Sequence, residues 1–352
     1  MIRFESDYLE GAHPQVLEAL VKTNAEQAPG YSEDVYCERA REMIRARFEA
    51  PSAAVHFLVG GTQVNAVMIR AILRPHQGVL CAVSGHINAH ETGAIEAGGH
   101  KVLALPSEDG KITAAAVQAY YDAHWADGSH EHIVQPGMVY ISNPTENGTL
   151  YTKQELQELY KTCFALGLPL YIDGARLGYG IMAGGDTPAP ADYTKYCDAF
   201  TIGGTKVGAL FGEALVINNH TLAKDFRYLI KQSGGLLAKG RLLGVQFCAL
   251  MEDDLYFKIA AEADRLALRL RDGFQACGYS MLFESVTNQQ YPVLPDALLA
   301  RLDEKYTYCY WQRVDESHSA VRFCASPFTR EEDVDALLAD VASLTKNIEA
   351  AI

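Results

Sequence analysis

The chain lacks the features that mark several large classes of protein. Its eight cysteines include no CxxC pair, so the sequence indicates neither a zinc ribbon nor a disulfide framework. No apolar run approaches membrane-spanning length, and charged residues interrupt the first twenty positions, so we expect neither a membrane anchor nor a signal peptide. No block of lysine and arginine occurs, and the net charge is −14. Such a chain would repel nucleic acid, and its charge favours a soluble, cytoplasmic protein.

The remaining composition is that of an ordinary globular protein. Hydrophobic residues make up 49% of the chain and charged residues 21%, with no low-complexity tract or internal repeat. Disorder is therefore not expected. A length of 352 residues is enough for a large core and favours more than one domain.

Strand-like and helical stretches alternate through the first two thirds of the chain. The apolar runs at 53–60, 78–83, 101–105, 137–142, 168–173 and 198–204 have the composition of buried strands. Between these runs, apolar residues recur at helical spacing, as in 63–73. Continuous apolar strands separated by helices predict an α/β fold with a mostly parallel sheet covered by helices on both faces.

The pattern changes near residue 255. A long helical stretch ends at Cys277-Gly278, and a tyrosine-rich segment, a strand-like segment at 319–325 and a final helix follow. We expect a small α+β domain at 251–352, a large ligand-binding domain at 29–250 and an N-terminal arm at 1–28, which ends at Pro29-Gly30.

Chemically suggestive residues follow four of the predicted strands. In an open parallel sheet, ligands bind beyond the carboxyl ends of the strands, so these residues should share one edge. A glycine-rich turn that opens a helix offers free backbone N–H groups and a positive dipole end to a phosphate. The residues are Gly60-Gly61-Thr62, His86, Asp173 with Arg176, and Lys206.

Taken one at a time, these residues have ordinary explanations: a tight turn, a core histidine, a structural ion pair and a solvated loop lysine. Together, a phosphate cradle, a stacking ring, a carboxylate and a desolvated amine are the set that pyridoxal phosphate requires. Lys206 would form the Schiff base, which needs an amine of lowered pKa. Asp173 would keep the pyridine nitrogen protonated.

Two other functions also fit some of these residues. His86 and His90 are four positions apart with Glu91 beside them, as in the metal site of a hydrolase, although the H-E-x-x-H order is absent. Gly93 also weakens the long helix that such a site needs. A phosphate-binding module without catalysis is the other alternative, but it gives Lys206 no purpose.

The chain resembles the low-specificity L-threonine aldolases of the β-eliminating lyase group, which are fold type I pyridoxal-phosphate enzymes. The resemblance runs from Phe4 to about Arg330. It rests on the order and spacing of "FESDYLEGAHP", "GYSEDVY", "GGTQVN", "GHINAHETGA", "YIDGARLG" and "GGTKVGALFGE". It implies a large cofactor-binding domain, a smaller C-terminal domain, and a homodimer or homotetramer with sites at the interface.

The resemblance also implies roles for particular residues. Lys206 matches the Schiff-base lysine, Asp173 the partner of the pyridine nitrogen, and His86 the ring that stacks on the cofactor. The phosphate cradle would comprise Gly60, Gly61, Thr62 and Thr205. The substrate carboxylate would be held by Ser6, Arg176 and Arg322, with Arg176 also close to the cofactor.

Three parts of the sequence depart from the family's more familiar branch. In this chain the Schiff-base lysine follows a threonine, whereas in that branch it follows a serine. The segment "YSEDVYCER" offers Tyr31 or Tyr36 as the counterpart of the family's tyrosine, and Tyr31 is our candidate. In "KQSGGLLAKGR" the cation for a neighbouring subunit's phosphate would be Lys231, Lys239 or Arg241, and we favour Lys239. The family's second substrate-facing histidine would correspond to His132.

The implied reaction is retro-aldol cleavage of a β-hydroxy-α-amino acid, such as L-threonine or L-allo-threonine, to glycine and an aldehyde. A fixed carboxylate would align the Cα–Cβ bond for cleavage. His86, His132 or a water that they hold would remove the β-hydroxyl proton. β-Elimination and transamination are the alternatives on the same cofactor, because a fold determines the cofactor better than the bond that breaks.

Overall fold

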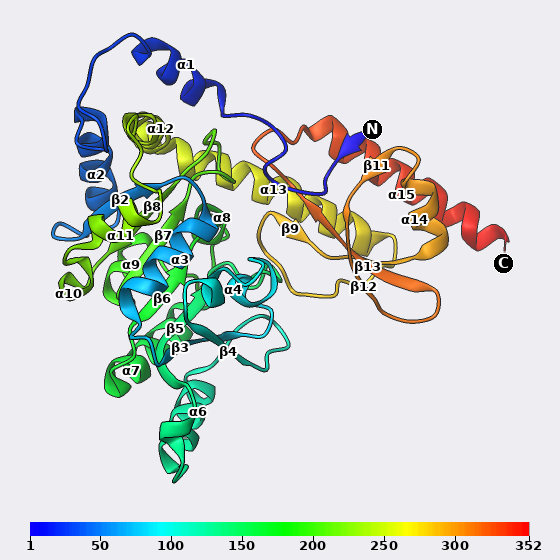
Figure 1. Ribbon diagram of the computed structural model, residues 1–352. Helices are drawn as coiled ribbons and strands as arrows, with labels where there is room; N and C mark the ends of the chain where they lie inside the picture. Colours follow the sequence, from blue (N-terminus) through cyan, green and yellow to red (C-terminus); the bar gives the residue numbers. More distant parts are fainter. Residues whose placement is uncertain (352) are drawn as a thin grey trace.

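The computed structural model describes the backbone of residues 1–351 and the side chains of residues 1–347. Figure 1 shows a large lobe built around a central sheet and a smaller lobe formed by the last third of the chain. The long helix α13 (Leu255–Ala276) runs from one lobe into the other. The predicted α/β class with a smaller C-terminal sheet domain is confirmed.

The large lobe contains a seven-stranded sheet in the order β2–β8–β7–β6–β5–β3–β4. β8 is antiparallel to both of its neighbours, whereas the other adjacent strands are parallel. Six strands therefore end at the same edge. The strands are β2 (Ala54–Leu58), β3 (Gln77–Ala82), β4 (Lys101–Leu105), β5 (Gln135–Ser142), β6 (Leu170–Asp173), β7 (Ala199–Gly203) and β8 (Glu213–Ile217).

The strand β8 is the one that the apolar pattern did not predict. It begins at the edge where the other strands end, and its first residue, Glu213, pairs with Leu58 of β2 and Gly203 of β7. This register places a buried carboxylate beside the turn that follows β7.

Helices cover both faces of the sheet, as expected for continuous apolar strands. Successive residues of one strand serve opposite faces, so Tyr140 and Ile141 of β5 belong to different core clusters. One face packs on α3 (Gly61–Ile72), α5 (Ala94–Ala97) and α11 (Phe226–Gln232). The other packs on α2 (Val35–Arg47), α6 (Ala114–Ala126), α7 (Lys153–Leu166), α8 (Leu177–Met182), α9 (Pro190–Lys195) and α12 (Arg241–Met251).

The helical stretch predicted after residue 86 is broken into α4 (His86–Ala89) and α5. Thr92 and Gly93 both adopt left-handed backbone conformations, with φ of 53° and 71°. A β-branched residue rarely adopts this conformation, so the break must be held by its surroundings. The turn brings Glu91 back to the side chain of His86.

The small lobe combines a sheet with three helices. Its strands are β9 (Gln289–Gln290), β10 (Val293–Pro295), β12 (Cys309–Arg313) and β13 (His318–Cys324). They pack with α13, α14 (Asp296–Leu302) and α15 (Glu331–Ala351). Short segments elsewhere are α10 (His220–Ala223) and the 3₁₀ helices η1 (His130–His132) and η2 (Glu252–Asp254).

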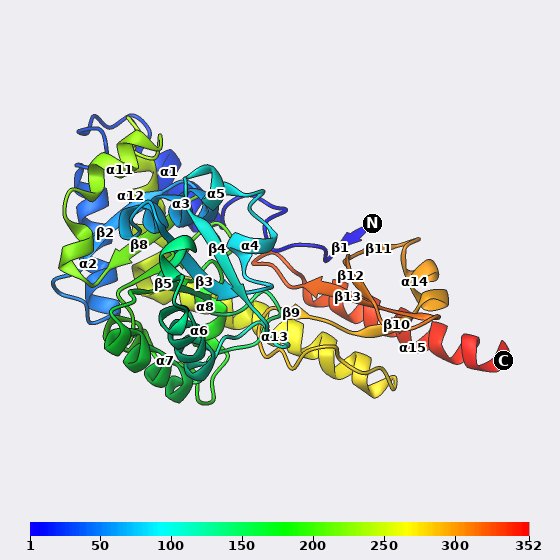
Figure 2. The same cartoon turned by 60° about the horizontal axis from the view of Figure 1, so that its bottom comes forward.

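The N-terminal segment joins both lobes. β1 (Ile2–Arg3) pairs with β11 (Tyr306–Thr307) of the small lobe, and α1 (Pro14–Thr23) packs on α12 of the large lobe. Both views place the N-terminus beside the orange and red segments (Figures 1 and 2). The boundaries 1–28, 29–250 and 251–352 stay a prediction. None of the described helices combines the length and apolar composition needed to cross a bilayer.

Candidate active site

The predicted residues of four strands meet at one edge of the sheet. Gly60 and Gly61 follow β2, His86 follows β3, Asp173 ends β6, and Lys206 follows β7. All of these strands run in the same direction, so their carboxyl ends lie together. The structure thus assembles the group on which the cofactor prediction rests.

Asp173 is a buried carboxylate held by three donors. Its side chain accepts hydrogen bonds from Asn65 Nδ2 at 2.8 Å and the Tyr140 hydroxyl at 2.7 Å, both on Oδ2. The backbone N–H of Ala175 donates to Oδ1 at 2.9 Å. Only 5% of the residue is exposed. The carboxylate is therefore held in one orientation before any ligand binds.

Asn65 and Glu91 connect Asp173 to His86. Asn65 Nδ2 donates to Glu91 Oε1 at 2.7 Å, and His86 Nδ1 lies 2.7 Å from the same oxygen. Burial lowers the pKa of His86, but the Glu91 hydrogen bond and the charge of Asp173 outweigh it, so the pKa is raised. The imidazole is thereby held by one nitrogen, and its ring orientation is set by Glu91.

Glu146 completes this hydrogen-bonded network, although the sequence analysis did not name it. It lies in the loop after β5, and its Oε1 accepts from the backbone N–H of His86 at 3.0 Å and from Ser142 Oγ at 2.6 Å. Burial raises the pKa of Glu146, and the Ser142 hydrogen bond opposes this rise. The signal that could have found it is its place after the predicted strand at 137–142.

Lys206 is partly buried in the turn between β7 and β8. Burial lowers the pKa of its amine, and the nearby charge of Arg176 lowers it further, against the opposing charges of Asp7 and Asp173. A lysine with a lowered pKa is a better nucleophile towards a carbonyl group at neutral pH.

The Thr205 hydroxyl makes two hydrogen bonds within its own chain. Its Oγ1 donates to Glu213 Oε1 at 2.7 Å and accepts from the backbone N–H of Gly212 at 3.0 Å. Burial raises the pKa of Glu213 to about 7, against the opposing Thr205 hydrogen bond and Lys206 charge. Thr205 therefore supports the turn that carries Lys206, and its part in the phosphate cradle stays a prediction. Thr62, by contrast, is exposed at the first turn of α3.

Arg176 is paired with a carboxylate of the chain itself. Its Nε and Nη2 donate to the two oxygens of Asp7 at 2.6 and 2.8 Å, and Asn288 Nδ2 donates to Asp7 at 2.9 Å. Burial would raise the pKa of Asp7, but Arg176 and Lys206 outweigh it and lower the pKa to about 2. The pair fixes the guanidinium and leaves Nη1 for a ligand. Asp7 directly follows the predicted Ser6, and no local pattern in the sequence points to its ionic partner.

Ser6 and Arg322 bring unpartnered polar atoms to the same region. Ser6 Oγ and Arg322 Nε are buried and have no hydrogen-bond partner among the described residues. Arg322 Nη2 donates to the backbone carbonyl of Glu5 at 3.1 Å, which ties β13 of the small lobe to the segment that holds Ser6. Unsatisfied buried donors at a candidate site indicate a missing polar ligand.

The structure does not bring His132 to this site. His132 is exposed in η1, which precedes β5, whereas Asp173 pairs with Ser142 at the other end of β5. A strand of eight residues spans about 25 Å. The prediction failed because residues before a parallel strand lie at the opposite edge from those after it.

Tyr31 and Lys239 also lie outside the Asp173 network of their own chain. Tyr31 is 44% exposed and lies near Lys231, whose Nζ is 4.6 Å from the centre of the tyrosine ring. Both line a separate cavity of about 570 Å³ together with Tyr228. Lys239 is exposed in the turn between α11 and α12. The roles predicted for Tyr31 and Lys239 stay predictions.

The other candidates from these two segments are engaged elsewhere. The Tyr36 hydroxyl donates to Glu26, and Arg241 Nη2 donates to the Asn24 carbonyl at 3.0 Å. Within the described part of the chain, no three His, Cys, Asp or Glu side chains converge as metal ligands would.

Comparison with known proteins places this arrangement in a family. The family model of the beta-eliminating lyases matches residues 4–296. The low specificity L-threonine aldolase of Pseudomonas sp. (strain NCIMB 10558) is 31% identical, over 97% of this chain and 97% of that protein. That of Pseudomonas aeruginosa is also 31% identical, over 96% of each.

Solved structures agree with this assignment. A threonine aldolase of Leishmania major superposes with a TM-score of 0.95 at 39% identity, covering 98% of this chain and 100% of that one. The histidinol-phosphate aminotransferase of Clostridium acetobutylicum, at 14% identity and a TM-score of 0.72 over 99% of this chain and 100% of its own, shares the fold alone. The resemblance seen in the sequence is confirmed, and the chain belongs to the β-eliminating lyase family of fold type I pyridoxal-phosphate enzymes.

Proposed function

We propose that the chain is a pyridoxal-phosphate-dependent aldolase that cleaves β-hydroxy-α-amino acids, such as L-threonine and L-allo-threonine, to glycine and an aldehyde. One observation carries the proposal: a partly buried lysine of lowered pKa and a fixed buried aspartate share one sheet edge, and two side chains suited to a carboxylate each keep one buried polar atom without a partner. These residues are Lys206, Asp173, Ser6 and Arg322. The threonine aldolases among the chain's relatives support the same reaction.

The residues present fit pyridoxal phosphate. A Cβ built on Gly60 or Gly61 would meet nothing within 4 Å, so open space lies in front of the N-terminus of α3, where a phosphate is favoured. Asp173 would hold the pyridine nitrogen, the His86 ring would stack on the cofactor, and Lys206 would bind its aldehyde carbon. When bound, the cofactor would supply an electron-accepting ring to the Cα of an amino acid.

The substrate carboxylate would be held by Ser6, Arg176 and Arg322. Asp7 orients Arg176 through two hydrogen bonds, so the guanidinium need not be ordered when substrate binds. The unpartnered Nε of Arg322 and Oγ of Ser6 would each gain a partner. Fixing the carboxylate restricts rotation about the bond to Cα, and this orientation selects the bond that breaks.

Product analysis tests this function. We expect purified protein with pyridoxal phosphate to release glycine and the matching aldehyde from L-threonine, L-allo-threonine or phenylserine. Ammonia with a keto acid would instead identify β-elimination, and a requirement for an amino-group acceptor would identify transamination. Absence of all three reactions would favour a non-catalytic phosphate-binding module.

We also propose that the protein works as a homodimer or homotetramer in the cytoplasm. The exposed positions of Tyr31 and Lys239 support a site completed by a neighbouring subunit, and the net charge of −14 suits a soluble protein. Light scattering coupled to size exclusion should give a multiple of the 38.6 kDa chain mass. Full activity in a monomer would contradict the shared site.

A further inference from the structure

The loop after β5 carries a titratable group that the roles above leave unused. Glu146 follows Ser142, the last residue of β5, and so lies at the sheet edge where Asp173 and His86 lie. Retro-aldol cleavage needs an acceptor for the β-hydroxyl proton at this edge. His86, His132 or a water that they hold was predicted for that task. His132 lies at the other edge, and His86 Nδ1 is engaged by Glu91, while its ring is assigned to stacking on the cofactor.

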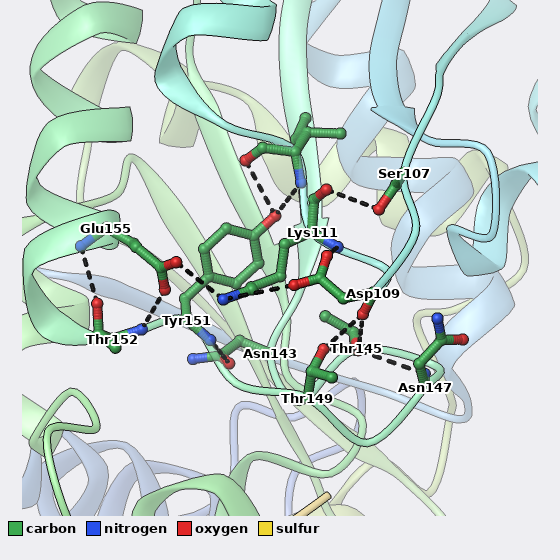
Figure 3. Close-up of polar contacts among 11 residues, drawn as sticks. Ser107, Asp109, Lys111, Asn143, Thr145, Asn147, Thr149, Tyr151, Thr152 and Glu155 are labelled. Carbon is green, nitrogen blue, oxygen red and sulfur yellow. Dashed lines mark hydrogen bonds and ion pairs between the residues drawn. The ribbon is translucent and has the colours of Figure 1, made fainter. Parts of the chain in front are cut away.

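The loop is held in place from the side of the large lobe. Thr145 and Thr149 share a hydrogen bond of 2.6 Å between their hydroxyls, and Thr149 Oγ1 also lies 2.6 Å from the backbone carbonyl of Asp109. Asn143 Oδ1 accepts from the backbone N–H of Tyr151 at 3.2 Å. Figure 3 shows these contacts of Asn143, Thr145 and Thr149.

The small lobe also contacts the loop. The Tyr291 hydroxyl donates to the backbone carbonyl of Glu146 at 2.6 Å. Gly148 has a φ of 75°, and a Cβ there would stand 2.4 Å from Ser285 Oγ. Glu146 therefore projects from a fixed backbone between the two lobes, which is how a group that acts on a bound substrate must be held.

The two oxygens of the Glu146 carboxylate have different surroundings. Oε1 accepts both the His86 N–H at 3.0 Å and Ser142 Oγ at 2.6 Å. Oε2 has no hydrogen bond from any described residue, and it is not among their fully buried unpartnered atoms. One oxygen is thus anchored, and the other is open to a ligand.

The surroundings of Glu146 raise its pKa above the ordinary value of a glutamate. Burial and the like charge of Asp173 favour its protonated form, while His86 and Ser142 favour the ionised form. A carboxylate of raised pKa is a stronger base than an exposed one. The other titratable groups that interact with it are Cys81, Tyr140, Tyr151 and Tyr291.

We propose that Glu146 accepts the β-hydroxyl proton of the substrate, an inference that rests on the proposed aldolase function. The proton moves from the hydroxyl oxygen to Oε2, and the oxygen's electron pair forms the carbonyl of the aldehyde. The Cα–Cβ bond breaks, its electron pair stays on Cα, and a proton added there gives glycine. During these steps, the hydrogen bonds from Ser142 and the His86 N–H to Oε1 hold the Glu146 carboxylate in position.

Replacing one oxygen tests the proposal in the holoenzyme. Glu146→Gln retains one oxygen to accept from Ser142 and the His86 N–H, but it replaces Oε2 with an amide NH2 group, which cannot accept a proton. We expect kcat/KM for threonine cleavage to fall about 10²–10⁴-fold, the range for loss of a general base. Cofactor affinity, followed by absorbance, and glycine affinity should stay unchanged. Glu158→Gln, the same change at an exposed position on α7, should leave all three quantities unchanged.

Glycine separates a proton-accepting role from a structural one, because it has no β-hydroxyl. Exchange of its α-proton with D2O, followed by NMR, should persist in Glu146→Gln. If Glu146→Gln loses both exchange and cleavage, or if it cleaves threonine at the wild-type rate, the proposal is overturned. If the wild-type protein shows neither exchange nor cleavage, the aldolase function itself fails.

Ser142→Ala provides a second variant whose readout is a pH profile. The Ser142 hydrogen bond lowers the pKa of Glu146, so its loss should move the acidic limb of kcat/KM to higher pH. An unmoved limb would contradict the assignment of that limb to Glu146.

Discussion

Asp7 and Arg176 form a buried ion pair whose loss should be measurable as a fall in thermal stability. The fall in the pKa of Asp7 from 3.8 to about 2 corresponds to about 2.4 kcal/mol of stability at neutral pH. Asp7→Asn removes this contribution and leaves Arg176 buried without a charged partner, so the total cost should be about 3–5 kcal/mol. At an unfolding entropy of roughly 2.1 cal/mol/K per residue, 352 residues correspond to a fall in Tm of about 4–7 °C.

The assay is thermal unfolding of the cofactor-free protein, followed by circular dichroism at pH 7.5. A matched control is Glu252→Gln, which removes an exposed ion pair with Arg39 and should cost at most about 1 kcal/mol. The pKa of Asp7 is depressed, so its contribution is complete above pH 3.8 and is lost as the pH falls towards about 2. An Asp7→Asn protein that unfolds at the temperature of the Glu252→Gln control would refute the reasoning.

Three further predictions concern the cofactor side of the site. Asp173→Asn should lower kcat/KM about 10²–10³-fold, as loss of one preorganised electrostatic contact does, and unchanged kinetics would contradict its role. Gly61→Ala should raise the stability of the cofactor-free protein by about 0.4–1 kcal/mol, because it lies in a helix facing open space, yet weaken pyridoxal phosphate binding measured by absorbance titration. Glu91→Gln should lower the pKa of His86 measured by NMR, since its hydrogen bond raises that pKa. The raised pKa of His86 contributes stability that is complete below about 6.5 and is lost as the pH rises through the folded value, and this dependence should weaken in the variant.

The sequence predicted the sheet edge because that edge depends on local signals. Apolar runs mark the strands, and the residues that end them, Asp173 and the turn to Lys206, need no knowledge of distant contacts. The same rule applied to the strand at 137–142 would have named Glu146 and rejected His132, which precedes the strand.

Other parts of the site depend on contacts that no local pattern reveals. Asp7 meets Arg176 only because the N-terminal segment joins the two lobes. Asn65 links Asp173 to Glu91 because α3 packs above the sheet, and neither sequence segment identifies the other. Thr205 turns towards Glu213 because β8 lies antiparallel beside β7. The apolar pattern did not predict β8.

The central claim is that the amine of Lys206 binds the aldehyde of pyridoxal phosphate at the edge of the sheet. Borohydride reduction of the holoenzyme followed by peptide mass spectrometry tests it most directly. The account predicts a pyridoxyl adduct on the peptide that contains Lys206, and none in Lys206→Ala. An adduct on another lysine, or no adduct in protein that still cleaves threonine, would contradict it.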